Sequence, residues 1–498
     1  MKLRKMTVLM LTAAMTAGLV AGCGGAATST SAAKAAATTA KAAATTAKAA
    51  ATTAKAAATT AAAKTTTAAA KAGGAKTVIT IWSKDRHDQK YVQSKVDEYN
   101  KNNKDDIQVD YKLYTDNYIQ AVDLAVQSGE LPDVLVLQDQ FLQKYASQGQ
   151  WADLYPLMDA DMKTYFKDEI YKNINEMDGK LYYIPTCGST GRLIYNTEIF
   201  SKAGIKEPPK TLKEMVDDAA LITSKLSKDG IYGFAGNFKG ATSALERSWD
   251  FVGERELGVK KGFDFKKGEY DFTGYATSLG YLKELLSDKC AFPGCESLDI
   301  DPLRTQFANG KIGMYISWTH AEPGVYKDQF PMDSSKWNAA PIPTSDGKEN
   351  GKQAISFTSA YLINAKGKNV DKAFKAYKNI FTTESYLTGY YEGGYGISIV
   401  PQVIKKAKLG QEYTSKPNLQ MMDIDAVLPR EPHEINAAAV AIEGQDYCKT
   451  FESIYYGGAD PASTLKDLTD RYNKAYKDGI AKGLGKEVKI PDYNPLKP

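Results

Sequence analysis

Gly179-Lys-Leu-Tyr-Tyr-Ile-Pro-Thr-Cys-Gly-Ser-Thr-Gly-Arg-Leu-Ile-Tyr-Asn196 is the stretch that decides the fold of this 498-residue chain. It reads as a short strand, a crossing segment rich in small residues, and a second strand that runs into Asn196-Thr-Glu-Ile-Phe200. Further on, Thr211-Leu-Lys-Glu214 has an N-capping residue followed three positions later by an acid, which predicts the start of a helix.

The residues before this stretch alternate between strand and helix patterns. Thr77–Trp82 is β-branched and aromatic, Ile107–Leu113 alternates with period two, and Val134–Leu137 is a short apolar run typical of a strand buried on both faces. Apolar residues at helical spacing lie between these strands, and the second helix is expected to end near Gly129. The pattern predicts an open α/β sheet. Ligands bind outside the carboxyl ends of such strands, which here are Trp82-Ser83-Lys84 and Gln138-Asp139-Gln140.

The N-terminus has the pattern of an export signal. Lys2, Arg4 and Lys5 form a basic start, Val8–Val20 an apolar run too short to span a membrane, and small residues precede Cys23. Val20-Ala-Gly-Cys23 resembles the lipobox of bacterial lipoproteins, which implies cleavage after residue 22, acylation of Cys23 and a membrane-anchored protein outside the cell. The alternative is an ordinary signal peptide with a chance cysteine.

Residues 23–76 are expected to be a low-complexity tether. They are almost entirely Ala, Thr, Ser, Gly and Lys, with a seven-residue repeat marked by Lys34, Lys41, Lys48 and Lys55. Ala and Thr bury too little apolar surface to offset the entropy of ordering, so we expect a disordered or partly helical spacer.

The remaining residues form a mildly acidic body. Residues 1–76 hold ten basic side chains and no acidic one, so residues 77–498 carry 53 Lys and Arg against 59 Asp and Glu. This balance argues against a nucleic-acid partner, which would require a basic face. A body of 422 residues also exceeds what one core usually supports, so two lobes are expected.

Several short motifs resemble those of the extracellular sugar-binding family that includes maltose-binding protein. They are Gly179 to Pro185, Tyr195 to Ile205, Pro209 to Glu214 and Phe307 to Met314, the last followed by Trp318. The resemblance covers roughly residues 77–498. It implies a two-lobed, periplasmic-binding-protein-like (type II) α/β fold with crossing hinge strands, which closes on its ligand.

By analogy with that family, each lobe is built from two pieces of chain. The N-terminal lobe would comprise 77–184 and 358–392, and the C-terminal lobe 185–357 and 393–498. The crossings are expected near Ile184–Gly188, Ala354–Ser359 and Glu392–Ser398. Glycines 393, 394 and 396 lie in the last of these and would let hinge dihedrals change.

Motifs for catalysis or cofactor binding are missing from the sequence. It has no phosphate-binding loop, no His-Glu-x-x-His and no Gly-x-Ser-x-Gly, and three histidines with five cysteines do not form a zinc pattern. We therefore expect neither an enzyme nor a cofactor or metal. A glycosidase needs only two carboxylates at the right separation, so that alternative stays open. Cys290 and Cys295 flank a Pro-Gly turn and form either a small disulfide loop or two free thiols.

Candidate ligand-binding residues are those whose positions place them near the expected cleft. Three tryptophans are expected to pack against a sugar ring, with a core role as the alternative for each: Trp82, Trp249 and Trp318. Polar candidates that would take sugar hydroxyls are Ser83, Asp139, Ser189, Arg192, Arg247, Glu392 and Tyr395. For the two arginines the alternative is a surface ion pair.

The resemblance and these residues together predict a lipid-anchored, monomeric substrate-binding protein of an ABC importer that captures a carbohydrate, in particular an oligosaccharide. The chain has no nucleotide site, so ATP would belong to partner subunits that associate with the permease. Alternatives are a surface glycan-binding protein without a transporter, and a binding protein for a solute that is not a sugar.

Overall fold

The computed structural model describes residues 76–114 and 117–498. The expected signal peptide (1–22), Cys23 and nearly all of the tether lie outside these residues. Residues 74–498 form one compact unit. Within the described residues, no helix combines the length and the apolar character that crossing a membrane requires.

The first sheet contains the three strands predicted from the N-terminal part of the body. Its spatial order is β15 (Tyr361–Ile363), β3 (Val134–Val136), β1 (Thr77–Ser83) and β2 (Ile107–Leu113). β1 runs parallel to both β2 and β3, whereas β15 is antiparallel to β3. Ile79, Ile81 and Val134 are fully buried, as the β-branched pattern predicts. The edge strand β15 comes from a much later part of the chain.

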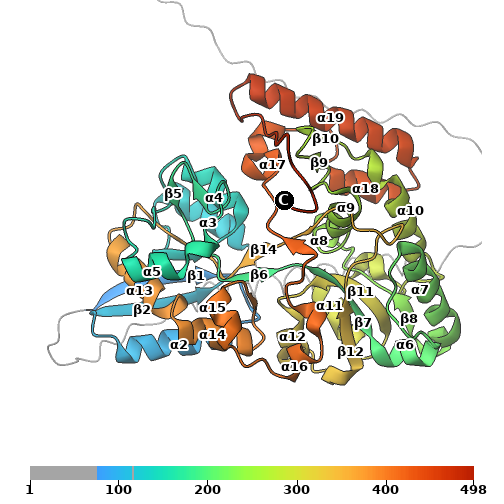
Figure 1. The fold of residues 1–498 in the computed structure, drawn as a ribbon, viewed down its shortest axis with the longest axis horizontal. Helices are drawn as coiled ribbons and strands as arrows, with labels where there is room; N and C mark the ends of the chain where they lie inside the picture. The colour runs from blue at the N-terminus through green and yellow to red at the C-terminus, as the bar shows by residue number, and fades with distance from the viewer. Residues whose placement is uncertain (1–75, 115–116) are drawn as a thin grey trace, which may run out of the picture. The chain divides into compact units, whose positions relative to one another are not determined.

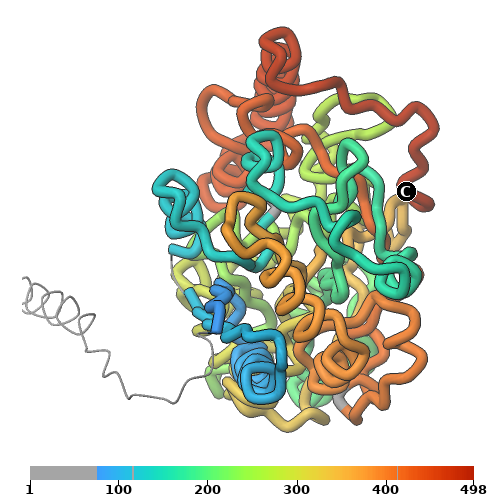
Figure 2. Tube along the Cα trace, turned by 90° about the vertical axis from the view of Figure 1, so that its left-hand side faces the viewer, coloured from blue at the N-terminus to red at the C-terminus, as the bar shows by residue number. Residues whose placement is uncertain are grey.

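Helices from both ends of the body surround this sheet. They are α2 (Gln89–Asn102), α3 (Tyr118–Ser128), α4 (Asp139–Ala146), α13 (Val370–Phe381), α14 (Glu384–Glu392) and α15 (Pro401–Lys406). α3 ends at Gly129, whose φ of 73° is left-handed, as the sequence predicts. Figures 1 and 2 show α14 beside α2, and the Tyr91 hydroxyl of α2 donates a hydrogen bond to the Tyr386 carbonyl (2.8 Å).

A second four-stranded sheet is built from the middle of the chain. Its order is β12 (Trp337–Ala340), β7 (Gly191–Asn196), β11 (Ile312–Trp318) and β8 (Tyr232–Phe234). The helix predicted after Thr211 is α7 (Leu212–Leu226), and Thr211 and Glu214 form the expected capping box. The other principal helices of this region are α6 (Thr197–Ala203), α8 (Ala241–Glu246), α9 (Trp249–Leu257), α10 (Ala276–Leu285), α11 (Ile300–Ala308), α18 (Tyr447–Tyr455) and α19 (Pro461–Ala481).

A small third sheet connects the two larger ones. β6 (Cys187–Ser189) pairs antiparallel with β14 (Ser356–Thr358) and with β16 (Ile397–Ser398). These three strands overlap the crossing segments expected from the sequence. Figure 1 shows β6 and β14 running between the two four-stranded sheets. After Thr190, the chain of β6 continues directly into β7, so the crossing strand and the second sheet share one backbone.

The cysteines of the described residues are all buried and free. The Sγ of Cys290 lies 3.7 Å from the Val216 carbonyl, and the Sγ of Cys295 lies 3.9 Å from the Tyr456 hydroxyl. Burial raises the pKa of both thiols to about 11. Of the two alternatives left by the sequence, the structure therefore has the pair of thiols and not the disulfide.

Candidate solute-binding site

Trp318 occupies the carboxyl end of β11, where the buried strand gives way to the surface. Its side chain is half-buried, and its ring meets the Phe251 ring edge-on with centroids 4.7 Å apart. Gly191 is the register partner of Trp318 on β7. A Cβ on Gly191 would come within 2.2 Å of the Phe251 ring, so the glycine makes room for the ring that holds Trp318.

The two residues that follow Trp318 are fixed to the crossing strand. The backbone N–H of Thr319 donates to the Thr190 carbonyl (2.8 Å), and the Thr190 N–H donates to the Thr319 hydroxyl (3.2 Å). His320 then places Nδ1 2.6 Å from the Ser189 Oγ, which also accepts the His320 backbone N–H (3.3 Å). The end of β11 and the crossing strand β6 are thereby held together through side chains.

Arg247 lies between α8 and α9, close to His320. Its Nη1 is buried and has no hydrogen-bond partner among the described residues. Burial, followed by the charge of Arg304, lowers the pKa of Arg247 to about 10, so the guanidinium stays charged at neutral pH. Burial, and then the neighbouring charges of His87 and Arg247, lower the pKa of His320 well below its usual value. The site therefore contains a charged arginine beside a neutral histidine.

Residues after β1 approach the same place from the first sheet. The His87 ring lies 5.4 Å from the His320 ring, and its Nε2 is 2.9 Å from the Tyr395 carbonyl. Tyr395 in turn stacks on Tyr91 with ring centroids 5.1 Å apart. The structure thus groups the predicted residues Ser189, Arg247 and Tyr395 around a pair of histidines.

Two further predicted residues end β1 without reaching this group. Trp82 is half-buried, and its ring is tilted against Tyr114 with centroids 4.5 Å apart. Ser83 is buried, and its hydroxyl accepts the Asp85 backbone N–H (3.1 Å). Asp139 follows β3, as predicted, and is the first residue of α4, but its side chain lies outside the described part of the structure.

Three predicted residues have roles in the structure that differ from the sequence expectation. Trp249 is fully buried and donates its Nε1–H to the Ser278 carbonyl (3.1 Å), so its ring packs in the core and offers no surface to a ligand. Glu392 is exposed at the end of α14 and accepts the Lys408 backbone N–H (2.6 Å). Arg192, the third, is completely buried in an ion pair.

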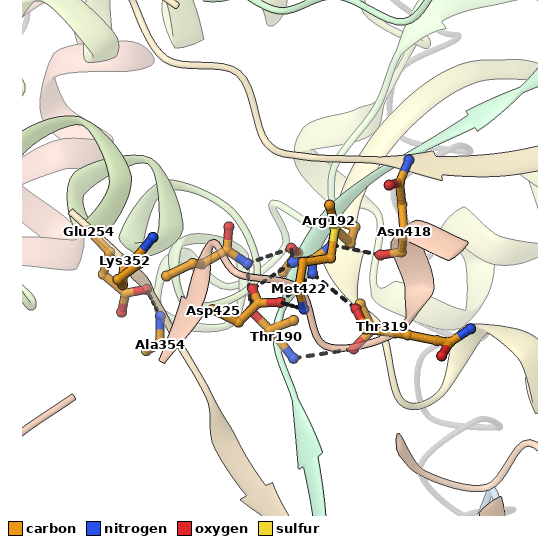
Figure 3. A network of polar contacts seen from close by, with 12 residues as sticks. Thr190, Arg192, Glu254, Thr319, Lys352, Ala354, Asn418, Met422 and Asp425 are labelled. Carbon is orange, nitrogen blue, oxygen red and sulfur yellow. Dashed lines mark hydrogen bonds and ion pairs between the residues drawn. The ribbon is translucent and has the colours of Figure 1, made fainter. Parts of the chain in front are cut away.

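The buried ion pair of Arg192 connects a late segment of the chain to the start of β7 (Figure 3). Its Nη1 and Nη2 donate to the two carboxylate oxygens of Asp425, at 2.9 and 2.5 Å. The Nε donates to the Asn418 carbonyl (2.7 Å), and the Thr190 hydroxyl donates to Asp425 (3.1 Å). Each polar end of the pair is satisfied within the protein, so Arg192 positions the backbone and has no donor left for a solute.

His87 and His320 are not among the site residues predicted from the sequence, where histidines enter only as possible metal ligands. No cluster of three metal-binding side chains occurs among the residues that the structure describes. One signal was available, since His320 lies two positions after Trp318 at the end of the same strand. His87 carried no comparable signal, because its loop is brought to His320 only by the tertiary fold.

Known proteins share this architecture. A Brucella abortus protein is 23% identical over 367 residues, which are 73% of this chain and 84% of the relative. The GacH receptor of Streptomyces glaucescens, solved unliganded and with acarbose, has a TM-score of 0.65 at 19% identity over 80% of this chain and 98% of its own. RafE of Streptococcus pneumoniae in complex with raffinose has a TM-score of 0.62 at 16% identity, covering 80% of this chain and all of its own.

Two α/β sheets joined by crossing strands, with aromatic and hydrogen-bonding side chains at the strand ends, define a type II periplasmic-binding-protein-like fold. Residues 83–387 match the family of bacterial extracellular solute-binding proteins. This chain belongs to that family, as the motifs in its sequence predict. The family and the solved neighbours are binding proteins.

Proposed function

We propose that this protein captures a carbohydrate, in particular an oligosaccharide, and delivers it to the permease of an ABC importer. The observation that carries this proposal is the half-buried Trp318, fixed at the end of β11 against Phe251 and two residues before His320. Sugar sites combine an aromatic face for the ring with a few convergent polar groups for the hydroxyls. The neighbours solved with acarbose and raffinose support an oligosaccharide.

Capture would take place between two lobes that close on the solute. The proposed division is 77–184 with 358–392, and 185–357 with 393–498. Trp82, Ser83 and Asp139 would then contact the solute from the first lobe, and Ser189, Arg247 and Trp318 from the second or its hinge. A ligand shifts the equilibrium between open and closed forms only if it contacts both lobes in the closed form. The candidate binding residues lie at the strand ends of both sheets, so such contacts on both sides are possible.

The expected result of a thermal-shift screen over neutral and acidic oligosaccharides is a marked stabilisation by a narrow set of them. A ligand at 100 times its dissociation constant adds about 2.7 kcal/mol to the free energy of unfolding. The same incubations are assayed for new reducing ends. Stabilisation without cleavage supports a binding protein, release of reducing ends would establish a glycosidase, and no response to any sugar would refute the proposed function.

The proposal places the protein on the outer face of the cell membrane, attached through a lipid on Cys23. The support is the sequence Val20-Ala-Gly-Cys23 after a basic and apolar start. Two acyl chains on one cysteine satisfy the requirement for stable anchoring, which a single chain does not meet. We expect Cys23→Ser to move the protein from the detergent phase to the aqueous phase, or to leave it unprocessed. A processed serine variant that stays in the detergent phase would contradict the anchor.

A further inference from the structure

The charged groups around His320 are paired, with one exception. The loop after β1, the helix α11 and the segment after β11 all bring charged side chains to this place. Three cations have a carboxylate partner: Lys84 with Asp85 (3.9 Å), Arg86 with Asp301 (3.1 Å) and Arg304 with Glu322 (2.9 Å). Asp88, a further carboxylate beside His87, accepts a hydrogen bond from the Tyr390 hydroxyl (2.8 Å). Arg247 has no carboxylate within 4 Å among the described residues.

The carboxylate that acts most strongly on Arg247 is engaged through one of its two oxygens. Glu322 is fully buried, its Oε2 accepts from the Nε of Arg304, and its Oε1 is buried without a hydrogen-bond partner among the described residues. The neighbouring Glu246 lies 3.7 Å from the Nζ of Lys261. Arg247 thus keeps a buried Nη1 with no acceptor. Leaving a buried charged donor unpaired is costly, so an acceptor from outside the protein would be bound favourably here.

His320 is a second candidate donor near Arg247. The Ser189 Oγ accepts the backbone N–H of His320, and its own proton is free to point at the ring Nδ1 (2.6 Å). We assign the ring proton to Nε2 on this basis. A neutral His320 would then carry a donor at Nε2, in a site that the charge of Arg247 also reaches. Guanidinium groups bind carboxylates with particular strength because two parallel N–H groups match the two oxygens.

We propose that the captured sugar is acidic, and that Arg247 binds a carboxylate on it, as the uronic acids carry, while Trp318 packs against a ring. This inference rests on the proposed function and adds the chemical class of the solute. A neutral oligosaccharide would leave the guanidinium unpaired, whereas a uronate would give it the kind of carboxylate partner that Lys84, Arg86 and Arg304 already have.

The test compares matched pairs of sugars that differ only in charge. Oligogalacturonates and glucuronic-acid-bearing xylo-oligosaccharides are titrated against the full-length protein, each alongside its neutral methyl ester. We expect at least one acidic sugar to bind ten times or more tighter than its ester. Esters or neutral sugars that bind as tightly as every acid would overturn this inference and leave the proposed function intact. Absence of binding by any sugar would overturn both.

Variants of Arg247 test whether this residue causes the preference for acidic sugars. Arg247→Gln should reduce the preference for the acid over its ester at least tenfold, and Arg247→Lys should keep part of it. The matched control is Arg471→Gln on α19, where the arginine pairs with the exposed Asp467 (2.8 Å). We expect this control to change neither the affinity for the acidic sugar nor the affinity for its ester. Because Arg247 has no hydrogen-bond or ion-pair partner within the described part of the chain, the ligand-free melting temperature of Arg247→Gln should not fall. An unchanged acid preference in a folded Arg247→Gln protein would refute the assignment.

Discussion

Replacing Arg192 by methionine should lower the free energy of unfolding by about 3–5 kcal/mol, the cost typical of breaking a buried ion pair on one side. Both side chains of the Arg192–Asp425 pair are completely buried. Without the guanidinium, the carboxylate of Asp425 would keep, among the described residues, the Thr190 hydroxyl and the Met422 N–H as donors (3.1 and 2.7 Å). The loss is measured by denaturant unfolding of the ligand-free protein.

Two further variants show whether the loss of stability in Arg192→Met comes from leaving the Asp425 carboxylate buried without its cation. Arg192→Met combined with Asp425→Leu removes both charges and should recover a substantial part of the stability. Lys213→Met is the matched surface control, because the Lys213–Asp217 pair is exposed and should contribute little to stability. A loss at Arg192 no larger than that at Lys213, or a double variant as unstable as the sum of the singles, would contradict the role given to the pair.

The sequence predicts best the features that depend on neighbouring residues. β1, β2 and β3 follow from β-branched and alternating runs, and the start of α7 follows from Thr211 and Glu214, since the cause of each is local. Arg192 is a residue whose role depends on a distant part of the chain, which the sequence does not reveal. Its partner Asp425 is 233 positions away, on a two-residue strand (β17, Asp425–Ala426) without a pattern of its own. The sequence therefore shows that Arg192 is near the crossing, but not that its charge is already neutralised.

For Trp249, His87 and His320 too, the sequence does not reveal what tertiary packing decides. Trp249 stands in a polar stretch, Glu246-Arg-Ser-Trp-Asp250, which resembles an exposed loop, yet it begins a helix whose residues 249–255 are all buried. His87 and His320 are isolated in the sequence, yet the fold sets their rings 5.4 Å apart. Burial and proximity of this kind are properties of tertiary packing, so a single sequence without related sequences does not contain them.

Replacing Trp318 by alanine should weaken binding of the solute tenfold or more while costing the ligand-free protein little stability. Stacking of an aromatic side chain on a ligand ring contributes about 1–3 kcal/mol, by analogy with aromatic stacking on nucleobases. In the ligand-free protein, Trp318 is half-buried, and its specific contact is the edge-on pair with Phe251, of a kind worth about 0.5–1.5 kcal/mol. Titration calorimetry with a sugar from the screen and thermal unfolding without it measure the two effects on one variant.

Trp249→Ala supplies the matched control, because the same substitution removes a tryptophan that is fully buried and hydrogen-bonded to Ser278. We expect it to lower the free energy of unfolding by about 3–5 kcal/mol, the range for a large aromatic side chain in a core. The protein that remains folded should bind the sugar with nearly its normal affinity. The two tryptophans should therefore behave oppositely, one losing affinity and the other stability. If Trp318→Ala lost as much stability as Trp249→Ala and kept its affinity, Trp318 would be a packing residue, and the site at the end of β11 would lose the aromatic face on which the proposed function depends.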